Sequence, residues 1–140
     1  MVLSLYIERN DRMDMLKIMI VDDAAFMRRV LRMILEDLGH QIIAEAANGL
    51  EAVQMYRIVK PDLVTLDITM PEMDGISALK EILKFDSAAK VIMCSAMGQR
   101  HLIMEAIRSG ASDFVVKPVQ RERVLQAINY VFDMNLNRVH

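Results

Sequence analysis

At 140 residues with 54% hydrophobic residues, the chain has the length of one domain that can bury a substantial core without disulfides. The net charge of −2 argues against a nucleic-acid-binding surface, and no window offers the roughly 18 uninterrupted apolar residues of a membrane span. The single cysteine, Cys94, excludes an internal disulfide and fits a reducing cytoplasm. The three histidines are scattered and do not have the spacing of ligands to a soft metal such as zinc.

Residues 1–14 stand apart, because the first recognisable strand begins near Met15. Their apolar start is too short for a signal peptide and has no basic region before it. We interpret this segment as an N-terminal extension or a remnant of expression. The domain is expected to occupy residues 15–134, followed by a C-terminal tail at 135–140.

From Leu16 onward, strand-like and helix-like segments alternate five times. Short apolar runs predict strands at 16–21, 41–46, 63–66, 89–94 and 113–116. Apolar residues spaced three or four apart predict helices at 24–38, 49–59, 75–85, 100–109 and 120–134. Gly39 and Gly110 are typical of left-handed helix ends, while Asn48 and Asp74 are typical of N-terminal caps.

This strict alternation predicts an α/β fold, a five-stranded parallel doubly wound sheet with helices on both faces. The helices should bury their periodic apolar residues. In the first helix the apolar residues at helical spacing are Phe26, Val30, Ile34 and Leu38. In the last helix we expect Val124, Ile128 and Val131 or Phe132 to face inward.

Polar side chains follow four of the five predicted strands. Asp22 and Asp23 come after the first strand, Asp67 after the third, Ser95 after the fourth and Lys117 after the fifth. Because parallel strands bring their carboxyl ends to one edge of the sheet, these side chains should lie close together. The second strand alone ends without a candidate.

Three close carboxylates repel one another, so they need either a proton or a cation, and hard oxygen ligands favour Mg²⁺. Asp67 is then the natural nucleophile for a phosphoryl group, with Lys117 and Ser95 binding the phosphoryl oxygens. Each residue also has a plainer interpretation. Asp67 can be an ordinary loop aspartate, Asp23 a helix cap before Ala24, Lys117 a solvated lysine and Ser95 an ordinary strand-end serine. Pro118 favours a fixed backbone after Lys117.

These motifs together resemble the receiver domain of two-component response regulators. The matching segments are Asp22-Asp23, the DITMPEMDG segment that begins at Asp67, Ser95-Ala96 and FVVKP at 114–118, and the match spans about 16–134. The resemblance implies a flavodoxin-like fold with strand order 2-1-3-4-5. It also implies that the chain is a regulatory phosphoacceptor rather than an enzyme.

The resemblance assigns roles to individual residues. Asp67 would accept phosphate from a histidine kinase or phosphotransfer protein, and Lys117 would pair with that phosphate. Asp23, Asp67 and the backbone carbonyl of Thr69 would ligate Mg²⁺, with Asp22 acting mostly through water. Ser95 and Phe114 would form the switch pair, in which Phe114 keeps an aromatic ring but lacks a tyrosine hydroxyl.

Several alternatives remain open from the sequence. The chain resembles single-domain receivers such as the chemotaxis regulator, but a phosphorelay intermediate or a receiver from a longer transcription factor would look similar. A haloacid-dehalogenase-type phosphatase also uses an aspartate nucleophile with Mg²⁺. That family requires Asp-x-Asp, whereas Thr69 stands two residues after Asp67. A nucleotide-binding module is disfavoured because no glycine-rich phosphate loop is present.

The predicted fourth helix suggests an output surface. Ile103 and Ile107 lie four residues apart and share a face, whereas Met104 is the better core candidate. We expect this pair, beside Phe114 and with the fifth strand and last helix, to contact a downstream protein or a second copy of the chain. Burial of both isoleucines is the competing interpretation.

Two positions are expected to set the lifetime of the phosphorylated state. By the resemblance, Thr69 and Met97 flank the path of the water that hydrolyses the acyl phosphate. The chemotaxis regulator has amide and carboxylate groups at these positions. Met97 is apolar and Thr69 has only a short hydroxyl, so we expect slow self-dephosphorylation.

Overall fold

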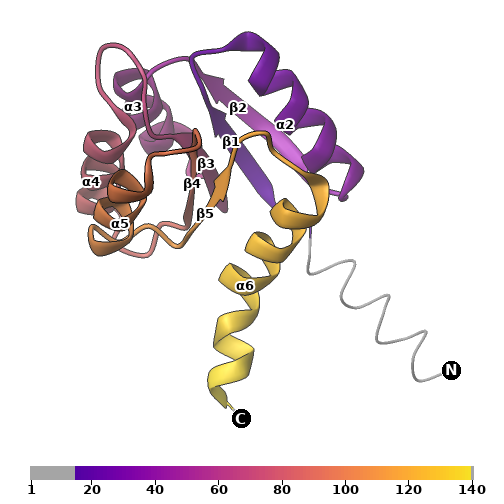
Figure 1. Cartoon of the computed structure of the whole chain (residues 1–140). Coiled ribbons are helices and arrows are strands. Elements are labelled where there is room, and N and C mark those ends of the chain that lie inside the picture. Colours follow the sequence, from indigo (N-terminus) through magenta and orange to yellow (C-terminus); the bar gives the residue numbers. More distant parts are fainter. Residues whose placement is uncertain (1–14, 140) are drawn as a thin grey trace, which may run out of the picture.

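A computed structural model describes residues 15–139, so the extension or remnant predicted at 1–14 lies outside the described residues. Five parallel strands form one sheet in the order β2-β1-β3-β4-β5 (Figure 1). The strands are β1 (Lys17–Val21), β2 (Gln41–Ala46), β3 (Leu63–Asp67), β4 (Val91–Ser95) and β5 (Asp113–Val116). The helices are α2 (Ala25–Asp37), α3 (Gly49–Val59), α4 (Gly75–Phe85), α5 (Arg100–Arg108) and α6 (Arg121–Val139).

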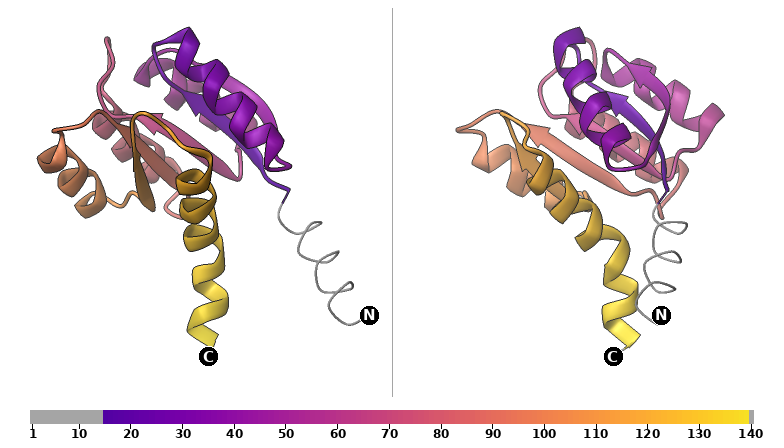
Figure 2. Two further views of the ribbon diagram at one scale, coloured as in Figure 1. Left: turned by 45° about the vertical axis from the view of Figure 1, so that its right-hand side comes forward. Right: turned by 90° about the vertical axis from the view of Figure 1, so that its right-hand side faces the viewer.

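The helices form a layer on each face of the sheet, as the alternating pattern predicted. Helices α2 and α6 cover one face, and α3, α4 and α5 cover the other (Figure 2). Successive residues of β1 point to opposite faces, so Ile18 packs with α2 and α6 while Met19 packs with α3 and α4. Because both faces are covered, the inner strands read as continuous apolar runs.

Strand β3 lies at the centre of the sheet, and all five of its residues are buried. It pairs with β1 on one side and with β4 on the other, where Asp67 stands opposite Cys94. The apolar run therefore ends in a carboxylate at the carboxyl edge of the sheet. This edge is where an open α/β sheet has its binding crevice.

The predicted helix ends agree well with the structure. Asn48 accepts a hydrogen bond from the Glu51 amide, and Asp74 accepts one from the Ser77 amide, each at 2.8 Å. Gly39 has φ +97° and Gly110 φ +111°, a region that glycine occupies without the strain of a side chain. These short-range signals correctly located the ends of four elements.

Two local predictions were wrong. Helix α2 buries Leu31 and Leu35, while Phe26 is 66% exposed, because a second apolar stripe one position along the helix faces the sheet. Helix α6 continues to Val139 instead of ending at Met134. In contrast, Val124, Ile128 and Val131 are buried as expected.

The plainer interpretation of Asp23 does not apply, because Asp23 does not cap α2. Ala24 occupies the capping position and no side chain caps the helix, whereas the Ala24 amide donates to Asp22 Oδ1 at 2.9 Å. The helix starts one residue later than predicted, so the Asp23 carboxylate is available for the cluster described below.

Among the described residues, none of the helices is both long enough and apolar enough to cross a membrane.

Candidate functional site

Three carboxylates meet at the carboxyl edge of the sheet. Asp22 and Asp23 follow β1 and Asp67 ends β3, and one oxygen of each lies within 4.8 Å of the others. Asp22 is fully buried and Asp67 is 5% exposed, whereas Asp23 is exposed. This is an acidic pocket with one open side, as a site that takes up a small charged ligand requires.

Lys117 provides a positive charge in this pocket. Its Nζ lies 3.0 Å from Asp22 Oδ2 and 3.4 Å from Asp67 Oδ2. The Lys117 amide donates to the Ser95 carbonyl at 2.7 Å, and the Lys117–Pro118 bond is cis. The lysine is therefore held against the carboxylates by the end of β5 and is not a solvated loop residue.

The electrostatics of the pocket make ionisation of Asp67 less favourable than that of a free aspartate when no cation is bound. Burial, followed by repulsion from Asp22, raises the pKa of Asp67 to about 6, although Lys117 and a backbone hydrogen bond from Thr69 lower it. Burial lowers the pKa of Lys117, but the neighbouring carboxylates outweigh burial and raise it. One positive charge does not balance three carboxylates, and this imbalance favours a further cation.

Ser95 lies at the end of β4, next to this pocket. Its side chain is fully buried, and its hydroxyl has no hydrogen-bond partner among residues 15–139. A buried hydroxyl without a partner is costly, so a ligand that accepts a hydrogen bond there would be stabilised. The oxygen-only donor set of the three aspartates fits Mg²⁺, which prefers carboxylates and water.

The loop after β3 is held close to the nucleophile candidate by a glycine. The Gly75 amide donates to the Ile68 carbonyl at 2.7 Å. A Cβ atom at Gly75 would lie 2.0 Å from the Asp67 carbonyl oxygen, so only glycine fits. The DITMPEMDG segment thus folds back on the strand that carries Asp67.

Strand β2 contributes indirectly, which the sequence did not predict. Arg28 on α2 donates to the Asp22 carbonyl at 2.7 Å and to Glu45 of β2 at 3.1 Å. Glu45 also binds Arg32, with its closest contact at 2.6 Å. The pattern of polar and apolar residues in the sequence gives no sign of this ion-pair network. Through Arg28, the network holds the backbone at Asp22, one of the candidate metal ligands.

Both residues that were predicted to set the lifetime of the phosphorylated state are exposed. Thr69 is exposed and Met97 is 78% exposed. The Thr69 hydroxyl accepts a hydrogen bond from Gln99 Nε2 at 2.8 Å. Gln99 was missed by the sequence analysis, because only the folded loops bring it to Thr69, 30 positions away.

The structure shows how far the residues of the predicted output surface are exposed. Ile107 is 43% exposed, but Ile103 is half-buried and packs against the core. Met104 is 51% exposed and was wrongly placed in the core, since Ala106 is the buried residue of α5. Phe114 is half-buried, with the Arg123 guanidinium 5.5 Å from its ring centroid.

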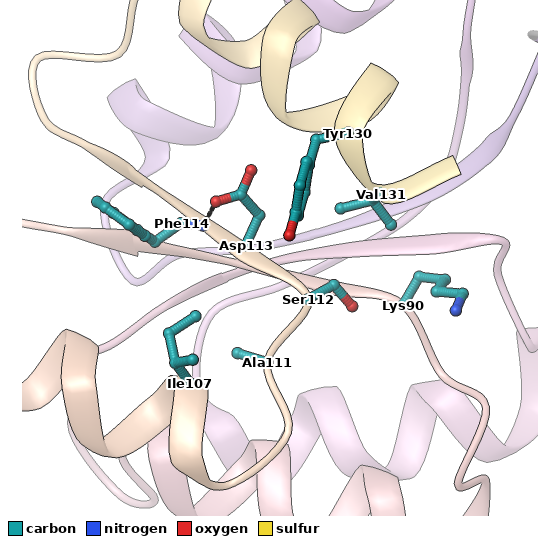
Figure 3. A pocket seen from close by; sticks show the side chains of 8 residues that line it. All are labelled: Lys90, Ile107, Ala111, Ser112, Asp113, Phe114, Tyr130 and Val131. Carbon is teal, nitrogen blue, oxygen red and sulfur yellow. Dashed lines mark hydrogen bonds between the residues drawn. The ribbon is translucent and has the colours of Figure 1, made fainter. Parts of the chain in front are cut away.

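These residues of α5 and β5 border two hollows. Ile103, Met104, Ile107 and Phe114 are among those that line a groove of about 560 Å³. Ile107 of α5 and Phe114 of β5 also border a second pocket of about 580 Å³, which Tyr130 of α6 lines as well (Figure 3). The surface formed by α5, β5 and α6 is therefore uneven and partly apolar.

Comparison with known proteins agrees with this geometry. The family model of the response regulator receiver domain matches residues 18–129. The chain is 60% identical over 114 residues to the chemotaxis protein CheY of Listeria monocytogenes, covering 81% of this chain and 96% of that protein. It is 59% identical over 113 residues to CheY of Bacillus subtilis, covering 81% and 94%.

Solved structures show the same relationship. The CheX–CheY–BeF₃–Mg²⁺ complex from Borrelia burgdorferi contains a chain that is 46% identical, with a TM-score of 0.80, covering 83% of this chain and 88% of that one. The receiver of CheB from Thermotoga maritima is 37% identical, with a TM-score of 0.72, covering 82% and 97%. This chain therefore belongs to the response regulator receiver domain family and acts as a regulatory phosphoacceptor in two-component signalling.

Proposed function

We propose that Asp67 is the residue that accepts the phosphoryl group. The observation that carries this proposal is the set of groups around it. A second buried carboxylate and an exposed third lie within 4.8 Å, a lysine Nζ lies 3.4 Å away, and an unpaired buried hydroxyl lies at the end of the adjacent strand. Asp22 shares the cluster and lies 3.0 Å from the same Lys117 Nζ, but it is fully buried and its Oδ1 already accepts the Ala24 amide.

The donor is a phosphohistidine of a histidine kinase or phosphotransfer protein. An oxygen of ionised Asp67 attacks the phosphorus, so that an O–P bond forms while the N–P bond breaks and its electron pair returns to the imidazole. Lys117 pairs with one oxygen of the transferred group, and the Ser95 hydroxyl donates to another. Both groups are already held at the edge of the sheet, so little reorganisation is needed.

Mg²⁺ fits the acidic pocket. Asp23, Asp67 and the backbone carbonyl of Thr69 would hold it, with Asp22 acting through water. When bound, the ion neutralises the carboxylates and the charge that develops on the phosphoryl oxygens. These protein groups promote the phosphorylation of Asp67 and the later hydrolysis of its acyl phosphate, and they act on no separate substrate.

We further propose a chemotaxis-type pathway in the cytoplasm, because the relatives of highest identity described above are single-domain chemotaxis regulators that this chain covers almost completely. Ser95 and Phe114 would transmit phosphorylation to the surface formed by α5, β5 and α6. Ile103, Ile107 and the two hollows beside Phe114 support this surface as the place where a downstream protein docks. A second copy of this chain is the competing occupant, and sedimentation of the phosphorylated protein distinguishes the two.

The test uses acetyl phosphate with Mg²⁺ as the phosphodonor. Wild type should acquire an acid-labile, hydroxylamine-sensitive phosphoryl group, and Asp67→Asn should not. Asp23→Ala should bind Mg²⁺ much more weakly than wild type, whereas Asp37→Ala on the exposed end of α2 serves as the matched control. Equal labelling of wild type and Asp67→Asn would refute the assignment of Asp67, and equal Mg²⁺ affinities would remove Asp23 from the metal site.

A further inference from the structure

The hydrogen-bond ladder between β3 and β4 stops at the level of Asp67. The Ile68 amide donates to the Cys94 carbonyl at 3.0 Å. In a regular parallel ladder the next bond would run from the Ala96 amide to the Ile68 carbonyl. That carbonyl instead accepts from the Gly75 amide at 2.7 Å, so the folded-back loop takes the acceptor and leaves the Ala96 amide without its backbone partner.

The side chain of Gln99 satisfies this amide. Gln99 Oε1 accepts from the Ala96 amide at 2.8 Å, while Nε2 donates to the Thr69 hydroxyl at the same distance. One side chain thus joins the β4–α5 turn to the β3–α4 loop, the two loops that flank Asp67. Gln99 also stands at the position before α5, so its placement is tied to the start of that helix.

We propose that Gln99 competes with the phosphoryl group on Asp67 for the Ala96 amide. This proposal rests on the function proposed for Asp67. Asp67 pairs with Cys94 and the ladder opens directly after this pair, so we expect a group attached to the Asp67 carboxylate to reach the Ala96 amide, which follows the end of β4. An anionic phosphoryl oxygen is a stronger acceptor than an amide oxygen, so phosphorylation displaces Gln99.

Displacement of Gln99 has consequences beyond the site. It releases the Thr69 hydroxyl and removes the side-chain bond that closes the exposed turn of Met97 and Gly98. The same turn leads directly into α5, whose Ile103 lines the groove described above. The exchange of one hydrogen-bond partner therefore links the phosphorylation site to the proposed docking surface.

Beryllofluoride with Mg²⁺ tests this competition, because it forms a stable mimic of the aspartyl phosphate. Gln99→Met keeps the length of the side chain but removes the competing amide oxygen. Relative to wild type, it should bind beryllofluoride about two- to tenfold more tightly, the net value of one hydrogen bond. Gln54→Met is the matched control, since Gln54 is exposed on α3 and makes no polar contact among residues 15–139. This variant should bind beryllofluoride as tightly as wild type.

A second readout reports on the Ala96 amide directly. In the free protein, Gln99→Met should shift the NMR resonance of this amide, and after beryllofluoride binding the resonances of the variant and wild type should coincide. Gln99→Ala is measured in parallel and should show the same affinity change. A role of Gln99 in loop stability alone would instead leave the affinity equal or make it weaker, and either result would overturn the proposal.

Beryllofluoride binding distinguishes failure of the Asp67 assignment from failure of the Gln99 competition. Should wild type and Asp67→Asn bind beryllofluoride equally, the function proposed for Asp67 fails. Should wild type bind and Asp67→Asn not, while both Gln99 variants match wild type, only the competition by Gln99 is refuted.

Discussion

Replacement of Asp67 by asparagine should stabilise the metal-free protein at neutral pH, although it removes the proposed phosphoacceptor. Asp67 is only 5% exposed, and burial together with Asp22 raises its pKa from 3.8 to about 6. A rise of about two units corresponds to about 3 kcal/mol, at about 1.4 kcal/mol per unit. Asparagine also loses some attraction to Lys117, so the expected gain is about 1–3 kcal/mol.

The pH dependence identifies the cause. Below about pH 4, Asp67 is protonated in the folded and the unfolded chain, so it does not change the free energy of unfolding. Between about pH 4 and pH 6 the unfolded chain releases this proton while the folded protein retains it, and stability falls. Above the folded pKa the cost is fully present. The advantage of Asp67→Asn should therefore grow from near zero at pH 4 to its full value above pH 7.

Urea unfolding in EDTA at pH 4, 5.5 and 7.5 measures this advantage, and thermal unfolding should show a rise of about 4–10 °C at pH 7.5. Asp37→Asn is the control, because Asp37 forms an exposed ion pair with Arg121 and should change stability little. Saturating Mg²⁺ should narrow the difference by stabilising the wild type. A variant that is no more stable than wild type in EDTA at pH 7.5, or equally stabilised at every pH, would refute the reasoning.

Three further predictions follow from the loops and the output surface. Gly75→Ala should cost about 1–3 kcal/mol and reduce phosphorylation by acetyl phosphate, since the added Cβ collides with the Asp67 carbonyl, while Ser77→Ala should have little effect in either assay. Met97→Glu and Thr69→Asn should each accelerate decay of the phosphoprotein, up to about tenfold, by supplying a group that orients water; unchanged or slower decay in both would end the lifetime hypothesis. Replacing Ile103 and Ile107 together by serine should weaken binding of the downstream partner and spare phosphorylation, whereas unfolding of the double variant would assign the pair to the core.

The helix stripes show where sequence periodicity is insufficient. Helix α2 carries two apolar stripes with helical spacing, and periodicity does not indicate which one faces the sheet. The stripe containing Leu31 and Leu35 is buried and Phe26 is exposed, while Ile34 and Leu38 of the predicted stripe are partly buried at the edge of the core. On α5 the small Ala106 packs into the core, whereas Met104, which was expected there, is exposed.

The sequence by itself determined the order of strands and helices, their caps, and the arrival of Asp22, Asp23, Asp67, Ser95 and Lys117 at one edge of the sheet. Those features depend on short-range periodicity and on the rule that parallel strands align their carboxyl ends. Only the tertiary structure decided the contacts of Gln99 with Thr69 and of Arg28 with Glu45. Both contacts join residues of separate loops or elements. Their distances are set by how the helices pack on the sheet, which no local pattern encodes.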